Sequence, residues 1–354
     1  MIYFTHDPLG VCYFCGLHAR SVLSLGAAMR RRDFVTLLGG AAAWPLAARA
    51  QQPGKPVIGF LVSATREGYA RPVLEVQAGL NDDGFVEGRN LAIEYRYADE
   101  QYDRLPVLAA DLVRRQVAAI FSTGGVISPL TAKAATTTIP VVFAMGSDPV
   151  KYGLVASLSR PGGNITGVTF YNSALAPKRL QLLREMLPTA AVVAMLVNPN
   201  NPNVQSDTAE MQAAARVIGV EIAIASAASE RDFDAAFATV ARLRADALLV
   251  HIDALFQSRA GQITALAARQ GVPTMGSGRS FTAAGGLISY GTDAVAMYRQ
   301  AGRYLGRILK GEKPAQLPVL QPTKFELIIN LKTAKALGLT ISESFLLRAD
   351  ELIE

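Results

Sequence analysis

The sequence predicts an α/β fold made of two doubly wound parallel-sheet lobes joined by a hinge. Apolar runs of strand length alternate with amphipathic helical stretches, as expected where helices cover both faces of a parallel sheet. This alternation occurs on both sides of the turn-rich segment Arg160-Pro161-Gly162-Gly163-Asn164. The chain has 354 residues, of which 50% are hydrophobic and 18% charged, so it can fill two cores.

In the first half, the continuous apolar run at 57–62 is typical of a strand covered on both faces, whereas 91–97 alternates and is expected nearer an edge. Further strands are expected at 118–121 and 140–144. The helices between them are expected to begin at Pro72, near Leu105 and at Ser128.

The second half repeats the pattern. Strands are expected at 165–170, 191–197, 221–225, 247–250, 273–275, 287–290 and 325–331, and helices at 180–187, 204–218, 230–243, 255–269 and 293–310, before a short helical tail. The chain is expected to cross between the lobes near 160–165, 287–291 and 320–324. The N-terminal lobe would then hold 53–164 plus 291–320, and the C-terminal lobe 165–290 plus 321–354.

Residues 29–50 have the pattern of an export signal peptide. Basic Arg30-Arg31-Arg32 precedes an uncharged run at 35–48, and Ala48-Arg49-Ala50 is a small-x-small cleavage site. The run is too short to span a bilayer, which takes about 20 apolar residues. Arg31-Arg32 resembles the twin-arginine (Tat) signal; a Sec leader and an uncleaved anchor are the alternatives. These observations predict a periplasmic protein that is cleaved near Ala50.

Residues 1–28 lie upstream of this leader and fit no part of it, so we expect them to be a non-native extension, with translation starting at Met29. Cys12 and Cys15 lie there with two of the three histidines, but no second ligand pair follows them. The mature chain would have no cysteine and one histidine, His251. No metal site and no cofactor are therefore expected.

The charge distribution argues against a nucleic-acid partner. The formal net charge of +6 comes partly from the arginines of the first 50 residues, and the remaining Lys and Arg form no clustered stripe. A DNA-binding regulator with this fold would carry a helix-turn-helix before Val57, where the leader lies.

Polar residues follow the expected strands, at the edge where open parallel sheets bind ligands. The candidate ligand-binding residues are Ser63, Thr123, Gly124, Asp148, Asn198, Asp253, Ser277 and Tyr290. Their hydroxyls, amides and carboxylates suit a small zwitterion. They include no nucleophile–base pair, so no catalytic residue is assigned.

Several of these candidates also have a structural interpretation. Gly124 lies in a segment that could be only a turn and helix cap, Asp148 precedes a proline and could cap a helix, and Asn198 lies in turn-forming sequence. Asp253 follows a buried strand, where an unpaired carboxylate is costly, so a cationic partner or a bound ammonium is expected beside it. His251 is expected to pack near a strand end.

Signatures of common enzymes are missing from the sequence. It contains no G-x-x-x-x-G-K-[ST] phosphate loop, no G-x-S-x-G elbow and no H-E-x-x-H pair. The first strand runs into Ser63-Ala64-Thr65 instead of a G-x-G-x-x-G turn, which gives no support for a dinucleotide site. The chain is therefore not expected to be an enzyme.

Four segments resemble a known family: Tyr-Ala-Asp-Glu-Gln-Tyr-Asp-Arg-Leu-Pro at 97–106, Gly-Ser-Asp-Pro-Val at 146–150, Arg-Pro-Gly-Gly-Asn-Ile-Thr-Gly at 160–167 and Gln-Pro-Thr-Lys-Phe-Glu-Leu at 321–327. They are similar to the substrate-binding proteins of ABC importers, of the tryptophan/tyrosine type. The similarity extends from Pro56 to Glu354.

This resemblance implies the type I periplasmic binding fold, a small-molecule ligand held between two lobes, and delivery to a cognate ABC permease and its ATPase. The protein would be a monomer that meets the membrane only through the permease. An amino acid or a related aromatic or carboxylated compound is the expected ligand, with its carboxylate near Ser63 and Thr123 and its ammonium on Asp253 or Asp148. An exported ligand sensor domain and an exported α/β enzyme are the alternatives.

Overall fold

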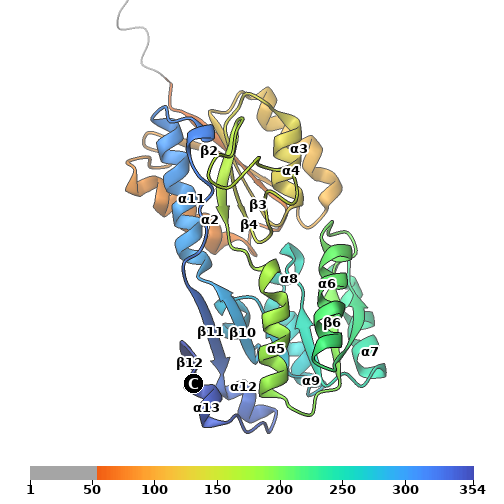
Figure 1. The fold of residues 1–354 in the computed structure, drawn as a ribbon. Helices are drawn as coiled ribbons and strands as arrows, with labels where there is room; N and C mark the ends of the chain where they lie inside the picture. The colour runs from red at the N-terminus through yellow and green to blue at the C-terminus, as the bar shows by residue number, and fades with distance from the viewer. Residues whose placement is uncertain (1–53) are drawn as a thin grey trace, which may run out of the picture. The chain divides into compact units, whose positions relative to one another are not determined.

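Two β-sheets, one of five strands and one of seven, organise the computed structural model, which describes residues 54–354 (Figure 1). The expected extension at 1–28 and export signal at 29–50 lie outside these residues. Lys55–Glu354 form one compact unit. No helix within it is both long and apolar enough to cross a membrane.

The five-stranded sheet is entirely parallel and has the order β2-β1-β3-β4-β5. Its strands are β1 (Val57–Val62), β2 (Ala92–Tyr97), β3 (Ala119–Thr123), β4 (Val141–Met145) and β5 (Ile165–Thr169). The central strands β3 and β4 are buried throughout, whereas the edge strand β2 is half-buried, as its alternating sequence predicted.

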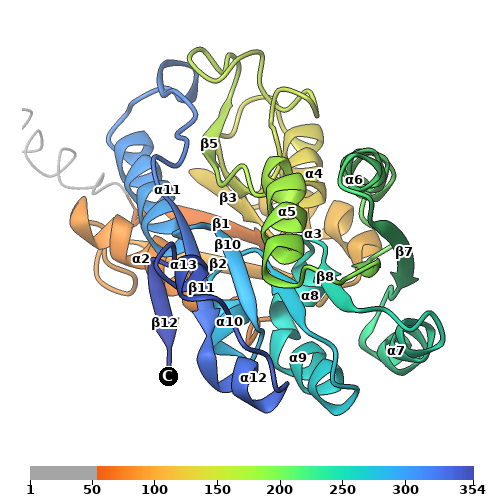
Figure 2. The ribbon, with the colours of Figure 1, turned by 60° about the horizontal axis from the view of Figure 1, so that its bottom comes forward.

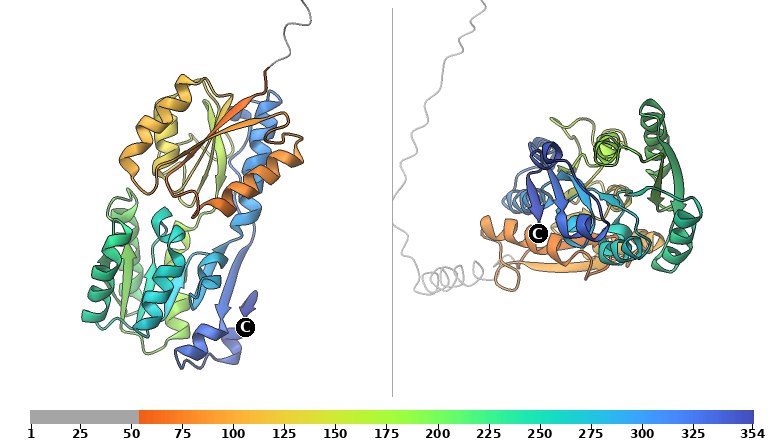
Figure 3. Two further views of the ribbon diagram at one scale, coloured as in Figure 1. Left: turned by 180° about the vertical axis from the view of Figure 1, so that it is seen from behind. Right: turned by 90° about the horizontal axis from the view of Figure 1, so that it is seen from below.

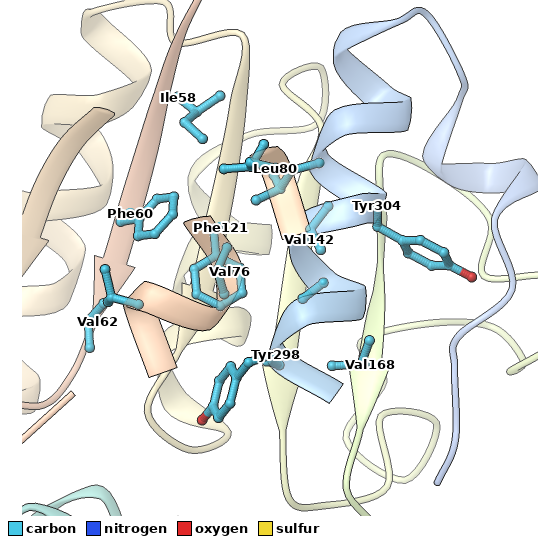
Figure 4. Close-up of a cluster of buried hydrophobic side chains, with 14 of the residues drawn as sticks. Ile58, Phe60, Val62, Val76, Leu80, Phe121, Val142, Val168, Tyr298 and Tyr304 are labelled. Atoms are coloured by element: carbon cyan, nitrogen blue, oxygen red, sulfur yellow. The ribbon is translucent and has the colours of Figure 1, made fainter. Parts of the chain in front are cut away.

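Helices cover both faces of this sheet, as Figure 3 shows from behind. They are α2 (Ala70–Asp82) and α11 (Ala294–Leu309) on one face, and η1 (Tyr102–Arg104), α3 (Leu105–Arg114) and α4 (Ile127–Ala135) on the other. One buried cluster joins these two helices to the sheet: it contains Val76 and Leu80 of α2, Tyr298 of α11, and Phe60 and Phe121 of the strands (Figure 4). We call this sheet and its helices the N-terminal lobe.

Strand β5 corrects the expected lobe boundary. The C-terminal lobe was expected to begin at Ile165, but Ile165 pairs with Val141 and the whole of β5 runs parallel to β4. The breaker at 160–164 is therefore a turn within one lobe. Gly167 allows the close pairing, because a Cβ there would collide with the carbonyl oxygen of Phe143. The first crossing lies after Thr169.

The seven-stranded sheet has the order β12-β11-β10-β9-β8-β6-β7. Its strands are β6 (Val192–Val197), β7 (Glu221–Ser226), β8 (Ala247–Val250), β9 (Thr274–Gly276), β10 (Ile288–Thr292), β11 (Phe325–Asn330) and β12 (Glu351–Ile353). All its strand pairs are parallel except β10 with β11. The predicted α/β fold is thus confirmed, with one antiparallel pair that the prediction of parallel sheets did not contain.

Helices again cover both faces of this sheet (Figure 2). They are η2 (Ser173–Leu175), α5 (Ala176–Met186), α6 (Val204–Val217), η3 (Glu230–Asp232), α7 (Phe233–Arg242), α8 (Ala254–Ser258), α9 (Ala260–Arg269), α10 (Arg279–Ala283), α12 (Leu331–Ala336) and α13 (Glu343–Leu346). The single helix expected at 255–269 is interrupted at Arg259, and the expected helical tail ends in β12. We call this sheet and its helices the C-terminal lobe.

Helix α11 returns the chain to the N-terminal lobe and packs closely on α2. Gly79 and Gly302 permit this contact, because a Cβ at either position would collide with a backbone carbonyl oxygen of the other helix. Asp82 pairs with Arg299 at 2.7 Å and with Arg303 at 3.1 Å. The chain then passes through η4 (Pro314–Gln316), beside β5, before it enters β11.

Candidate functional site

A cavity of about 490 Å³ is lined by residues of both lobes and of the segments that join them. Helix α2 contributes its N-terminal turn, and β9 and α8 contribute their ends from the C-terminal lobe. The crossing segments add Phe170, Asn172 and Thr292. The volume lies within the range of about 300 to 1,000 Å³ that is usual for small-molecule sites.

Aromatic side chains form much of the cavity wall. They are Tyr69, Phe170, Phe256, Phe281 and Tyr298. The rings of Phe170 and Tyr298 lie 5.1 Å apart between centroids, at 58°. Burial raises the pKa of Tyr69 well above its ordinary value and also raises that of Tyr298, so both phenols are neutral donors at pH 7. Such a wall can stack on a flat apolar group.

Charged side chains of both signs line the same cavity. They are Arg71, Glu75, Arg279, Asp293, Glu326 and Glu351. Arg279 pairs with Glu351 at 2.6 Å, and Glu326 pairs with Lys324 at 3.1 Å. Asp293 caps α11 by accepting from the Val295 amide at 3.0 Å. Glu75 takes part in none of the ion pairs of the described chain. It is a carboxylate available to a bound cation.

A smaller cavity of about 20 Å³ shares Tyr69, Phe170, Asn172, Gln257 and Tyr298 with the larger one. It is also lined by Thr123 and Asp253, two of the residues that the sequence proposed. Two of these lining residues bond to each other: the Tyr69 hydroxyl donates to Oε1 of Gln257 at 2.8 Å, a contact between the N-terminal and C-terminal lobes.

The Asp253 carboxylate accepts hydrogen bonds from both lobes. Its donors are the Tyr102 hydroxyl at 3.0 Å, Nδ2 of Asn198 at 3.1 Å, Nδ2 of Asn201 at 2.8 Å and the Leu255 amide at 2.9 Å. The last bond caps α8. The sequence predicted a cationic partner or a bound ammonium, whereas the carboxylate is surrounded by neutral donors. Asn198, also a candidate, belongs to this group.

Tyr102 is a residue that the sequence reasoning missed. It lies in η1 of the N-terminal lobe, and its hydroxyl reaches Asp253 of the C-terminal lobe. Burial, and then the neighbouring Asp253 carboxylate, raises the pKa of Tyr102, which keeps its proton available for this bond. The segment at 97–106 that carried the family resemblance contained it.

Ser63, Thr123 and Gly124 lie together at the ends of β1 and β3. The Ser63 hydroxyl donates to the Gly124 carbonyl oxygen, and Gly124 has a φ of +97°, which favours glycine. Thr123 donates to the Ala144 carbonyl at 2.9 Å and lies 3.4 Å from the Tyr298 hydroxyl. Of the three, Thr123 is the one that lines either of these two cavities.

The remaining candidates lie in different surroundings. Ser277 lines the larger cavity at the end of β9. Asp148 accepts from the Val150 amide at 2.8 Å within a turn, whereas the structural interpretation considered for it was a helix cap; no helix lies between β4 and β5. The Tyr290 ring packs 6.2 Å from that of Phe325, and its carbonyl oxygen accepts from Arg179. Neither Asp148 nor Tyr290 is among the residues that line the two cavities.

Asn172 and Arg179, which the sequence reasoning also missed, lie where the chain first crosses between the lobes. Asn172 lines both cavities and is 5% exposed. Arg179, in α5, is 1% exposed and donates to the Tyr290 carbonyl at 2.7 Å and to the Asn172 carbonyl at 2.8 Å. The Thr292 hydroxyl donates to the Phe170 carbonyl at 2.8 Å, so the crossings at 170–172 and 290–292 are bonded together.

His251 lines the larger cavity at the end of β8. Its Nε2 lies 2.9 Å from Oδ2 of Asp207, and both residues are 5% exposed. Its Nδ1 has no hydrogen-bond partner in the described part of the chain. Among residues 54–354, no group of three or more His, Cys, Asp or Glu side chains could hold a metal ion.

A comparison with protein-family models identifies the family of this chain. A family model described as "ABC transporter substrate binding protein" matches residues 59–353. A curated "Tyrosine-binding protein" of Clostridioides difficile (strain R20291) is 27% identical over 263 residues, which cover 73% of this chain and 74% of that protein.

Solved structures are similar over most of the chain. An ABC domain from Streptococcus pneumonia in complex with L-Trp has a TM-score of 0.76 and 25% identity, and the match covers 85% of this chain and 100% of that one. A conserved domain protein from Vibrio cholerae has a TM-score of 0.77 and 25% identity, with 84% and 99% of the two chains covered.

Proposed function

This chain belongs to the ABC transporter substrate-binding protein family, and from that premise we propose that it captures an aromatic amino acid, tyrosine or tryptophan, in the cavity between its lobes. The family binds its substrates without transforming them. The expectation of a binding protein is therefore confirmed, and that of an exported enzyme is set aside. The choice of ligand within the family is our proposal.

The cavity's combination of aromatic walls and charges of both signs carries this proposal. Phe170, Phe256, Phe281, Tyr69 and Tyr298 offer faces and edges to a ring. Glu75 offers an unpaired carboxylate to an ammonium group. A relative named as tyrosine-binding is similar in sequence, and a domain solved in complex with L-Trp is similar in both sequence and fold.

The ammonium is placed at Glu75 instead of Asp253 for a reason of hydrogen bonding. Four donors already contact the Asp253 carboxylate, and they come from Tyr102, Asn198, Asn201 and Leu255. Asp253 therefore bonds the two lobes to each other, while Ser277, which lines the larger cavity, remains available to contact the ligand.

Ligand capture would work by selecting the closed arrangement of the lobes. Tyr69 with Gln257, Tyr102 with Asp253, and Ser147 with Asn203 bond across the lobes in this structure. A ligand in the cavity adds contacts to both lobes at once, and only the closed form makes both sets. Opening would release the ligand to a cognate ABC permease, which an ATPase drives.

The remaining parts of the proposal concern the cell. The leader at 29–50 would export the protein to the periplasm as a monomer, by the twin-arginine route, with cleavage near Ala50. Mass spectrometry of periplasmic material should then find a terminus at or near Gln51. Replacing Arg31 and Arg32 by Lys should trap the protein inside the cell, whereas export of that variant would indicate Sec.

Calorimetry and thermal unfolding of the purified protein test the ligand. At 100 times its dissociation constant, tyrosine or tryptophan should stabilise the native state by about 2.7 kcal/mol. Leucine, which lacks the ring, and phenol, which lacks both charges, serve as matched controls. The proposal fails if neither aromatic amino acid binds, or if leucine binds as tightly as they do.

A further inference from the structure

Arg179 is a buried cation without an anionic partner in the described chain. Its guanidinium bonds are to carbonyl oxygens: the Tyr290 backbone at 2.7 Å, the Asn172 backbone at 2.8 Å and the Asn172 side chain at 3.5 Å. None of the ion pairs within residues 54–354 includes it. Burial lowers its pKa to about 9, so it stays charged at neutral pH. An uncompensated charge of this kind is costly to bury.

Asn172 lies between the Arg179 guanidinium and the cavity. Its Oδ1 lies 3.5 Å from Nη2 of Arg179 and 3.4 Å from the Thr292 amide, which fixes the amide group with its oxygen toward the arginine. Its Nδ2 therefore points to the other side, and no hydrogen bond of the described residues uses it. Asn172 lines both cavities, so two N–H donors are free for a ligand there.

We propose that Asn172 binds the α-carboxylate of the ligand and that Arg179 is the positioning residue that orients Asn172 and supplies the balancing positive charge. This rests on the proposed function, which it deepens by assigning one end of the ligand. Amide N–H donors backed by a buried cation suit an anion. Glu75 stays as the partner of the ammonium.

We call Asn172, with Arg179 behind it, the carboxylate anchor. It lies at the hinge, which is formed by the two segments where the chain crosses between the lobes, 170–172 and 290–292. Arg179 donates to Asn172 in the first crossing and to Tyr290 beside the second, from a helix of the C-terminal lobe. A carboxylate on Asn172 would compensate the charge that holds these two segments. Ligand charge would thereby stabilise the hinge in the conformation seen here.

The variant Asn172→Asp tests the anchor, because it puts a carboxylate of the protein where the ligand's would act. We expect tryptophan to bind wild-type protein about 100-fold more tightly than tryptophan amide, which keeps the ring and ammonium but lacks the negative charge. In Asn172→Asp this preference should disappear. Calorimetry with both compounds measures the ratio.

Arg179→Met, compared with Arg184→Met on the same helix, separates charge from packing. Arg179→Met should abolish the preference for tryptophan over its amide, and Arg184→Met should keep it. Far-UV circular dichroism checks that each variant is folded. A wild-type preference that survives in Asn172→Asp overturns the anchor.

A measurement without ligand tests the uncompensated charge of Arg179 whatever the ligand is. Because the carboxylate introduced by Asn172→Asp would pair with Arg179, the urea midpoint of this variant without ligand should exceed that of wild type; an unchanged or lower midpoint contradicts an uncompensated charge. Absence of any aromatic amino-acid binding to wild-type protein defeats the proposed function itself. That result differs from binding with an unaltered preference, which defeats the anchor alone.

Discussion

The Asp253 carboxylate accepts hydrogen bonds both from its own helix and from the other lobe. It caps α8 through the Leu255 amide and meets the Tyr102 hydroxyl of the other lobe. Asp253 is 2% exposed, so water has little access to the groups that donate to it and could not easily take its place if the carboxylate were removed. One side chain thus stabilises both a helix start and the contact between lobes.

Asp253→Ala is therefore expected to destabilise the unliganded protein by about 2 to 4 kcal/mol, since it removes a helix cap and leaves buried donors unsatisfied. Tyr102→Phe, which deletes one donor only, should cost about 1 kcal/mol. Urea unfolding measures both. An unfolding free energy of Asp253→Ala equal to that of wild type would mean that water replaces the carboxylate and that its role lies in ligand contact.

The sequence located part of the candidate site and missed the rest for a physical reason. Thr123 ends β3, and Asp253 and Ser277 follow β8 and β9; the rule that ligands bind beyond the carboxyl ends of parallel strands finds such residues. Asn172 follows β5 within the hinge, and Arg179 lies one turn inside α5. In sequence Arg179 looks like a solvated helix residue; its burial depends on β10, more than 100 positions away.

At the scale of elements, the contact between α2 and α11 depends on two glycines. A Cβ at Gly302 would collide with the Val76 carbonyl oxygen, which belongs to the backbone of α2 and cannot turn aside. Gly261, within α9, offers a matched control, because a Cβ there would meet nothing within 4 Å.

Gly302→Ala should lower the free energy of unfolding by about 3 kcal/mol, because the helices must separate to admit the methyl group. Gly261→Ala should raise it by about 0.5 kcal/mol, because alanine loses less backbone entropy in a helix. Thermal or urea unfolding distinguishes the two. Equal effects of the two substitutions would show that the helix pair tolerates wider spacing.

Periodicity predicted most elements but not how strands pair. The apolar run at 165–169 is a strand, as expected. Its residues gave no sign, however, that it pairs with β4 in the sheet of the N-terminal lobe. Strand β11 follows α11 and η4 in the chain and pairs antiparallel with β10, and its residue pattern did not reveal this direction. Strand β12 is three residues long and lacks a readable alternation.

At the scale of the whole molecule, the crossings make each lobe discontinuous in sequence. A break after Asn164 would remove both β5 and α11 from the five-stranded sheet. Because α11 covers the apolar face above Phe60 and Phe121, the remaining N-terminal piece would expose that face to water (Figure 4).

We expect the fragments 55–164 and 165–354, made separately, to be poorly folded, whereas a chain that starts at Lys55 and runs to Glu354 should fold as one unit. Circular dichroism and urea unfolding of the three products test this. A cooperative transition in the fragment 55–164 alone would contradict the dependence of the first sheet on β5 and α11.

Because α11 comes late in the chain, the ribosome makes it long after the α2 helix on which it packs. Asp83 at the end of α2 and Lys310 at the end of α11 are ion-paired although 227 positions separate them. A ribosome that adds about 5 to 20 residues per second would take on the order of ten to forty-five seconds between them. Throughout that interval the apolar surface that α11 covers in the finished protein would be exposed, and transiently exposed surface of this kind makes a nascent chain prone to aggregation.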